Sequence, residues 1–245
     1  MRQPIVLAFA LIAAACGAPS AQQGGQSSQP PVQQAGGSVA KAPCDNTYVP
    51  VKDGAKWTYK NTNSVTAPLL QVTTITNVGD RQFTETVADG NGTTWSETWS
   101  CVDGGLLQLQ NNGGAAGVAI GKSGKATVTT KSNTGLTIPT DPKPGDKWSQ
   151  TTESVIKGAG ITVTQKTTTT SHAVGMESVT VAAGSFDALR VEGEMTGDIT
   201  YQDGKTMHVT GKLSVWLVPG KGLVKAVSSV MSIDSSSELQ SFQIP

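Results

Sequence analysis

The sequence predicts an all-β protein folded as a strongly bent antiparallel sheet, either a half-barrel or an open barrel. No window repeats apolar residues at helical spacing over three turns. Short segments of alternating apolar and polar residues recur instead, and Gly, Asn and Asp turn signals separate them. This spacing favours consecutive antiparallel strands over strand–helix–strand units.

Turn signals set the expected strand boundaries along the chain. In the first half, we expect strands at residues 56–62, 69–78, 81–88, 93–102 and 105–110. In the second half, we expect strands at residues 147–155, 161–174, 178–181, 186–195, 199–201, 207–218, 223–233 and 239–244. Asp203-Gly204 predicts the clearest hairpin, with a type I′ turn, because Asp and Gly tolerate the positive φ that this turn needs.

Two segments of the chain begin alike. They are Gly54-Ala55-Lys56-Trp57 and Gly145-Asp146-Lys147-Trp148, each closely preceded by a proline. Each pattern predicts a glycine turn that leads into a strand whose first large side chain is an indole at the edge of the core. The similarity indicates either two similar, duplicated halves or a pattern shared by strand starts in general.

The segment from residue 207 shows how the two faces of the sheet differ. Val209, Leu213 and Val215 point to one side, and polar residues between them point to the other. One face therefore meets a core and the other meets water. With Leu189, these residues are the candidate core or ligand-facing positions. The Thr-rich run at residues 167–171 is polar on both sides, which predicts an exposed, extended ribbon.

A short apolar run at the N-terminus ends at a cysteine. Residues 5–15 carry no polar side chain and Cys16-Gly17 follows, which resembles the signal peptide and lipobox of a bacterial lipoprotein. These eleven residues span about 16 Å as a helix, whereas a bilayer core needs ~20 residues. We expect residues 1–15 to be a signal peptide and Cys16 to be lipidated. The alternative is an ordinary secretory signal, because Ala13-Ala14-Ala15 also offers a small-residue cleavage site.

The lipobox resemblance implies an exported protein anchored by lipid to the cell membrane. If the bacterium has an outer membrane, we expect the anchor there, because Gly17 rather than Asp follows the cysteine. Residues 16–43 are mostly Gly, Ala, Ser, Gln and Pro. They cannot bury enough apolar surface to offset the entropy of ordering, so we expect a disordered tether. Residues 44–245 then form the antiparallel β domain, as one large unit or two small ones.

The charge pattern excludes several classes of partner. Basic and acidic residues number 18 each and form no basic stripe, so we expect no nucleic acid partner. Residues 116–123 match a permissive phosphate-loop pattern. A phosphate loop needs a buried strand before it and a helix after it, and the sequence predicts neither. We therefore expect a Gly-rich surface loop, no nucleotide and no cofactor.

The cysteines and histidines are few. Export would place Cys44 and Cys101 in an oxidising compartment, where we expect a disulfide between them. The alternative is two buried free thiols. His172 and His208 lie far from both cysteines in the sequence and on polar strand faces, so we expect no metal site.

Three longer motifs stand out in the domain. The first has Tyr48, Pro50, Gly54, Trp57 and Tyr59, the second runs from residue 181 to 191, and the third from residue 216 to 225. Together they resemble motifs of bacterial envelope proteins with TapB-like or DUF3108-like domains, although Leu217 stands where an aromatic residue is usual. The resemblance implies an antiparallel β fold found in lipoproteins of mostly unknown role, and no catalytic residue. The third motif also suits a type II turn at Pro219-Gly220.

Catalytic constellations are missing from the sequence. Ser185 lacks the residues that frame a nucleophile elbow. Glu85, Glu192 and Glu194 alternate along strands, so we expect them to face solvent. We therefore do not expect an enzyme, although catalytic sites assembled from distant strands leave little trace in a sequence.

Two functions remain for the β domain. As a binding module, the bent sheet would enclose an apolar groove for a lipid, glycan or other hydrophobic ligand. As a structural or adaptor lipoprotein, it would have a filled core and an exposed apolar or aromatic patch, near Trp95 and Trp99, that contacts an envelope protein. The packing of the core-facing side of the sheet, filled or hollow, discriminates between these functions.

Overall fold

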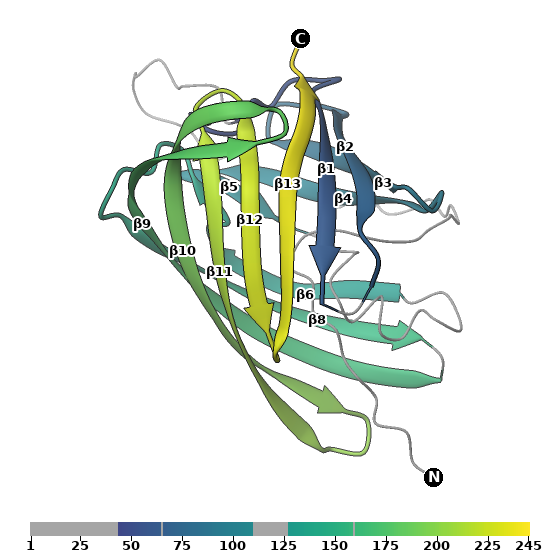
Figure 1. Cartoon of the computed structure of the whole chain (residues 1–245). Helices are drawn as coiled ribbons and strands as arrows, with labels where there is room; N and C mark the ends of the chain where they lie inside the picture. The colour runs from purple at the N-terminus through teal and green to yellow at the C-terminus, as the bar shows by residue number, and fades with distance from the viewer. Residues whose placement is uncertain (1–43, 65, 110–126, 159) are drawn as a thin grey trace, which may run out of the picture.

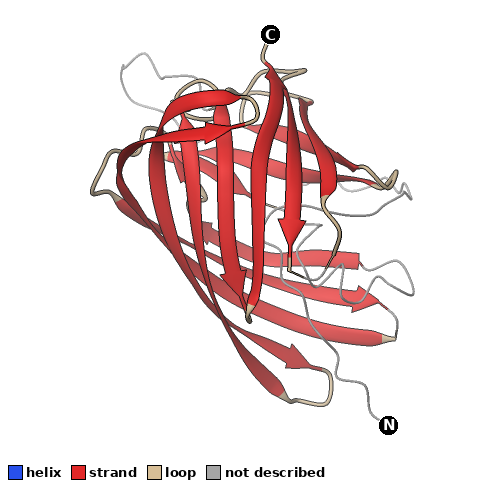
Figure 2. Cartoon of the chain, in the orientation of Figure 1, coloured by secondary structure: helices blue, strands red, loops and turns tan. Residues whose placement is uncertain are grey.

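The computed structural model describes residues 44–64, 66–109, 127–158 and 160–245. The expected signal peptide, Cys16, the tether and the loop at residues 116–123 lie outside these residues. In the described part, all strands join one antiparallel sheet and no helix is present (Figure 2). This confirms the prediction of an all-β fold with a bent, open sheet. The same part contains no helical segment able to cross a membrane.

The sheet has thirteen strands. In chain order they are β1 (Lys56–Asn63), β2 (Leu69–Thr76), β3 (Gln82–Asp89), β4 (Thr94–Val102), β5 (Gly105–Gln108), β6 (Thr127–Gly135), β7 (Ile138–Pro139), β8 (Lys147–Gly158), β9 (Ile161–Val181), β10 (Gly184–Tyr201), β11 (Thr206–Val218), β12 (Gly222–Val230) and β13 (Ile233–Gln243). In space their order is β6-β8-β9-β10-β11-β12-β13-β1-β2-β3-β4-β5-β7.

The sheet bends back over itself. Figure 1 shows β10 to β13 and β1 side by side in front, with β3, β4, β6 and β8 crossing behind them. Side chains on the enclosed side form three clusters of buried apolar residues, centred on Phe83 and Trp99, on Ile199 and Val209, and on Leu189. We call this side the inner face. Because a sheet without helices has no other cover, its own curvature buries the core.

Two strands were not expected from the sequence. β6 has Val128 as its single aliphatic residue, and β7 is two residues long. Neither segment shows the apolar alternation that marks a half-buried strand. Both form because the neighbours β8 and β5 offer free backbone groups for antiparallel pairing.

Several expected boundaries change in the structure. The segments expected at residues 161–174 and 178–181 join as β9, and those at 186–195 and 199–201 join as β10. The run at residues 167–171 lies inside β9, paired on both sides with β8 and β10, and Ser171 is 8% exposed. The segment is extended, as expected, but only Thr170 is exposed, so the prediction of an exposed ribbon is wrong for the other four residues.

Two hairpins differ from expectation in their turns. The strand expected at residues 223–233 breaks at Met231 (φ 50°) and Ser232 (φ 65°), which join β12 to β13. Positive φ at both central residues is the type I′ geometry. The hairpin at Asp203-Gly204 forms, but only Gly204 has positive φ, and the Tyr201 amide bonds to the Lys205 carbonyl. That turn is therefore a three-residue loop, and the type I′ prediction is wrong.

Residues of the first and third motifs meet at one end of the sheet. The Trp57 indole N–H donates to the Lys221 carbonyl at 2.6 Å, and the Tyr59 hydroxyl donates to the Leu223 carbonyl at 2.9 Å. Gly222 has φ 91°, and a Cβ at this position would lie 3.5 Å from the Trp57 ring. Gly220 has φ 67°, in agreement with the expected type II turn. These motif residues hold β1 against the turn between β11 and β12.

The two similar strand starts have the same local role. Trp57 is the second residue of β1 and is buried, and Trp148 is the second residue of β8 and is half-buried. Each indole donates to a backbone carbonyl of a turn or connecting segment, Trp57 to Lys221 and Trp148 to Thr137. The two strands belong to one continuous sheet.

The expected disulfide is present. Cys44 and Cys101 are bonded, with their Cα atoms 4.9 Å apart. Cys101 is 3% exposed and lies in the cluster around Trp99. The bond therefore ties the start of the described domain to β4.

Replacing both Cys44 and Cys101 with alanine is expected to lower the free energy of unfolding by about 4 kcal/mol. The bond closes a loop across a sequence separation of 57 residues, which restricts the unfolded chain. Urea denaturation of the oxidised protein and the variant measures the difference. Reduced wild-type protein is the control and should match the variant. A difference below about 1 kcal/mol would show that the bond adds little.

Replacing Met231 with Asn and Ser232 with Gly is expected to raise the free energy of unfolding by about 1 kcal/mol. Asn and Gly adopt positive φ with less strain than Met and Ser. Met231 is 37% exposed, so the change removes few contacts. Urea denaturation measures the gain. The control, Met231→Ala, keeps the strained backbone, and a double variant no more stable than this control would contradict the prediction.

Candidate functional site

Two glutamates face each other on the inner face of the sheet. Glu85 on β3 pairs in register with Glu97 on β4, between the pairs Phe83–Trp99 and Val87–Trp95. Residues that pair in register point to the same side, so both carboxyl groups share the side of the buried aromatic rings. Glu97 is 7% exposed and Glu85 is half-buried.

The expectation that Glu85 faces solvent is wrong. Phe83 and Val87 lie two residues away on the same strand and are buried, so alternation turns Glu85 inward with them. Glu192 and Glu194 on β10 are exposed, as expected. Glu97 was not among the predicted site residues. Its place two residues from both Trp95 and Trp99 is the signal that could have identified it.

Three side chains hold the two carboxyl groups. The Trp99 indole N–H donates to Glu85 Oε2 at 2.9 Å, and the Trp95 indole N–H donates to Glu97 Oε1 at 3.4 Å. The Gln108 amide on β5 donates to Glu97 Oε2. Each carboxyl group is thus fixed in position by at least one neutral donor.

The environment favours the protonated forms of both groups. Burial and the nearby Glu97 carboxyl raise the pKa of Glu85 to about 8, against the opposing effect of the Trp99 hydrogen bond. Burial raises the pKa of Glu97 to about 7, against the hydrogen bonds from Trp95 and Gln108. Burial and Glu85 also raise the pKa of Tyr59 above its ordinary value. The pair therefore holds at least one proton near neutral pH.

Further polar side chains lie on the inner face of β1, β2 and β13. Asn61 pairs in register with Ser237, and its amide donates to Gln71 Oε1 at 2.6 Å. Gln71 and Ser237 are 3% and 4% exposed. Asn61 Oδ1 and Ser237 Oγ are buried without a hydrogen-bond partner in the protein. Unmet groups of this kind usually bond to water or to a ligand.

These inner-face groups can donate and accept hydrogen bonds and can exchange a proton. Among the residues described, no group of three or more His, Cys, Asp or Glu side chains is placed to hold a metal ion. The inner face thus combines a carboxyl pair that holds at least one proton near neutral pH with amides and indoles, which suits binding to uncharged polar atoms.

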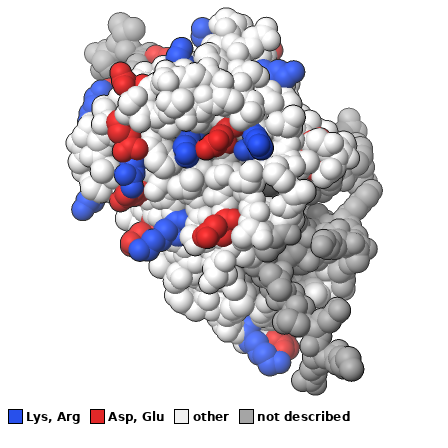
Figure 3. All heavy atoms as spheres, viewed as in Figure 1, with Lys and Arg blue, Asp and Glu red and all other residues white. Residues whose placement is uncertain are grey.

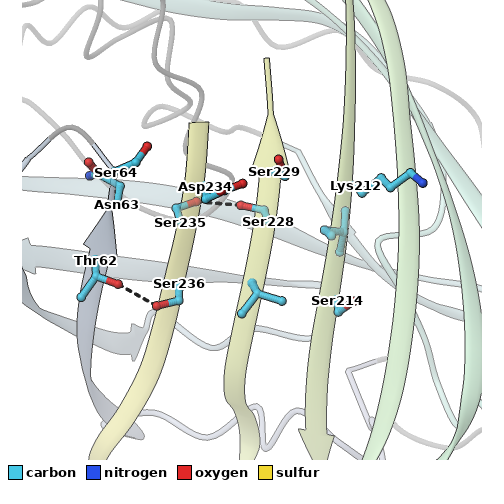
Figure 4. A pocket seen from close by; sticks show the side chains of 12 residues that line it. Thr62, Asn63, Ser64, Lys212, Ser214, Ser228, Ser229, Asp234, Ser235 and Ser236 are labelled. Carbon is cyan, nitrogen blue, oxygen red and sulfur yellow. Dashed lines mark hydrogen bonds between the residues drawn. The ribbon is translucent and has the colours of Figure 1, made fainter. Parts of the chain in front are cut away.

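A separate hollow of about 560 Å³ extends across β11, β12, β13 and β1 (Figure 4). Register places Ser214, Val227, Ser236 and Thr62 in one row across these four strands. Thr62 bonds to Ser236 at 2.7 Å between hydroxyl oxygens, and Figure 4 shows this contact. The complete lining is Thr62, Asn63, Ser64, Lys212, Leu213, Ser214, Val227, Ser228, Ser229, Asp234, Ser235 and Ser236.

Charged side chains on the outer face are spread among uncharged ones (Figure 3). Trp216 lies between two cations, with Arg190 and Lys225 each 5.8 Å from its ring centroid. Lys225 also pairs with Glu238 at 3.1 Å. His208 is exposed and lies 3.0 Å from Asp198. These contacts account for the charges here as exposed cross-strand pairs, which typically add little stability.

The candidate core or ligand-facing residues have separate roles. Leu189 and Val209 have 0% exposure and belong to two different core clusters. Val215 is half-buried against the cluster around Leu189, and Leu213 lines the hollow. They therefore do not line one common groove.

The aromatic patch expected near Trp95 and Trp99 is not at the surface. The two residues are 4% and 9% exposed, and Trp99 stacks on Phe83 with ring centroids 5.8 Å apart. Glu97 lies between them on the same face of β4, and all three residues point inward.

Comparison with known proteins places the fold. No family model matches the chain, and no curated protein matches it. An exported protein with a YmcC-like fold from Bacteroides fragilis is similar in structure, with a TM-score of 0.50 and 15% identity over 81% of this chain and 100% of that chain. This similarity shows a YmcC-like antiparallel β fold.

Two further solved structures are similar more distantly. A lipoprotein from Parabacteroides distasonis has a TM-score of 0.49 and 14% identity, over 81% of this chain and 100% of that chain. The hypothetical lipoprotein YmcC from Escherichia coli has a TM-score of 0.38 and 11% identity, over 78% of this chain and 85% of that chain.

Stability is expected to fall as the pH rises through the pKa values of the glutamate pair. Both pKa values lie above the ordinary 4.5. The contribution of the protonated pair to the free energy of unfolding is therefore fully present below pH 4.5 and is lost as the pH rises through about 7 and about 8. In the Glu85→Gln variant, the amide that replaces the carboxyl group cannot ionise. Between about pH 5 and about pH 9, the free energy of unfolding of this variant should fall by about 2 kcal/mol less than that of the wild type.

Urea denaturation across this pH range measures the difference between Glu85→Gln and the wild type. Glu194→Gln, at an exposed position, is the matched control and should follow the wild type. Parallel stability profiles for Glu85→Gln and the wild type would contradict the prediction.

Proposed function

We propose that this protein is an exported lipoprotein, anchored to the cell membrane through Cys16, whose β domain binds a lipid or other amphipathic ligand. The anchor sequence at residues 5–16 supports export and lipidation. The similar Bacteroides fragilis structure is that of a protein described as exported, which is consistent with the proposal. The three motifs found in the sequence favour a TapB-like or DUF3108-like domain within this class.

The observation that carries the binding proposal is the hollow across β11, β12, β13 and β1. Its volume of about 560 Å³ suits a small molecule or part of a lipid. Val227 supplies apolar contact, serine and threonine hydroxyls supply hydrogen bonds, and Lys212 supplies a positive charge. A ligand with an apolar part beside a polar or anionic group complements this lining.

A second function, that of an adaptor for another envelope protein, is favoured by a different observation. Leu189 and Val209 are fully buried, so these parts of the inner face are filled. Val174 and Met176 on β9 are 43% and 52% exposed, which leaves two neighbouring apolar side chains in contact with water. Exposed apolar side chains that lie together mark contact surfaces for partners.

The binding proposal is tested on protein purified from its native membrane in mild detergent. Intact-mass analysis should find a covalent diacylglyceryl group on Cys16, and organic extraction should release a second, noncovalent lipid. Ser214→Trp fills the hollow and should reduce the extracted lipid by about tenfold, because an indole occupies the space. Ser178→Trp, at an exposed position on β9, should retain it.

The outcomes separate the two functions. Wild-type protein that carries its anchor but releases no noncovalent lipid would overturn the binding proposal. Equal lipid release from Ser214→Trp and Ser178→Trp would show that the lipid binds elsewhere. A partner that crosslinks to wild-type protein, and no longer does so after Met176→Glu, would support the adaptor function instead.

A further inference from the structure

The two ends of the open sheet lie next to each other because one segment serves both. β6 pairs with β8 at one end of the sheet, and β7 pairs with β5 at the other. Leu136 and Thr137 alone separate β6 from β7. The Leu136 amide donates to the Ser149 carbonyl and the Thr137 amide to the Leu106 carbonyl, both at 2.9 Å. Consecutive residues thus bond to opposite ends of the sheet.

Glycine makes this change of partner possible. Gly135 has φ 88°, and a Cβ there would lie 2.0 Å from the Ser149 carbonyl oxygen. Gly105 on β5 is equally confined, because its Cβ would lie 2.3 Å from the Ile138 carbonyl oxygen. The first contact lies between β6 and β8 and the second between β5 and β7, so glycine permits close backbone contact at each end of the sheet, on either side of Leu136 and Thr137. We call the contact between β5 and the segment from β6 to β8 the seam.

Beyond the short pairing of β5 with the two-residue strand β7, side chains rather than a strand ladder complete the seam. The Gln108 carbonyl on β5 accepts hydrogen bonds from the Asn133 amide on β6 and, at 3.5 Å, from the Gln150 amide on β8. The Gln108 backbone N–H donates to Thr137 Oγ1 at 2.9 Å, and this hydroxyl donates to Gln150 Oε1 at 3.0 Å. Gln108 is thus the common partner of residues from both ends.

The same glutamine reaches the glutamate pair. Its side-chain amide donates to Glu97 Oε2, and Glu97 pairs in register with Glu85. Tyr59 on β1 is the other titratable group that interacts electrostatically with this pair. Among the described residues, no basic side chain lowers the pKa of either glutamate. Two negative charges here would have no cation among the described residues to offset them.

We propose that Glu85 and Glu97 form a proton-controlled latch on the seam. While the pair holds a proton, Gln108 stays between Glu97 and the residues of β6 and β8, and the two ends of the sheet remain together. When both carboxylates are charged, they repel each other and gain hydration if the seam opens. The seam opens before other parts because side chains and the two-residue strand β7 hold it, whereas β9, β10 and β11 are joined by long backbone ladders.

The pH at which the latch acts follows from its surroundings. Burial and mutual repulsion raise the pKa of Glu85 to about 8, and burial raises the pKa of Glu97 to about 7. The second ionisation therefore falls just above neutral pH. The proposal is independent of any ligand in the hollow, because the seam and the hollow share no residue.

Hydrogen exchange of the full protein with its disulfide intact tests the latch. Protection factors, which remove the chemical effect of pH, are compared at about pH 6 and about pH 9. At the higher pH, amides of Gln108, Leu136 and Thr137 should lose about tenfold or more protection, while those of β10 and β11 keep theirs. Glu97→Gln and Glu85→Gln should each abolish this loss.

Controls make each result decisive. Glu194→Gln changes an exposed glutamate and should lose seam protection as the wild type does. Unchanged seam protection in the wild type at the higher pH would overturn the latch. An equal loss in Glu97→Gln and Glu85→Gln would also overturn it, and so would an equal loss throughout the sheet, which would indicate general unfolding.

Discussion

The described domain depends on one constraint, which is that a sheet without helices must bury its own apolar face. Phe83 on β3 and the two β10 residues Ile199 and Leu189 come from strands that are distant in the sheet order, and each lies in a cluster on the enclosed side. Curvature brings these clusters inside and leaves the other face to water. The long strands β9, β10 and β11 provide this curvature, since antiparallel strands twist and coil as they lengthen.

The constraint explains the structural roles of the first and third sequence motifs. Trp57 and Tyr59 cap the turn between β11 and β12 through their polar atoms, while their rings pack in the main cluster. Gly222 is required because a side chain there would crowd the Trp57 ring. The disulfide between Cys44 and Cys101 closes the same end of the sheet. Motifs far apart in the chain therefore secure one edge of a single core.

The inner face carries buried polar side chains as well as apolar ones. A buried carboxylate without a cation is costly, and Glu85 and Glu97 avoid that cost by keeping a proton and accepting indole hydrogen bonds. Gln108 links the pair to the seam, where polar side chains and the two-residue strand β7 stand in place of a long strand ladder. The hollow across β11 to β1 lies elsewhere and has different chemistry. The domain thus keeps a proton-sensitive interior apart from its candidate binding surface.

The sequence by itself determined the all-β class, most strand positions and the likeness of the two tryptophan strand starts. It also determined that a disulfide within the expected domain would join Cys44 to Cys101, because no other cysteine lies there. Alternation shows which side chains share a face, and these features require nothing more.

Only the tertiary structure decided which face is enclosed, and so where Glu85 and Glu97 point. It also decided that β6 and β7 form and that the chain turns at Met231 and Ser232. The physical reason is the same in each case. Neighbouring strands pair with a strand's free backbone groups and set the side to which its side chains point. Which strands become neighbours is a non-local property that the local sequence does not encode.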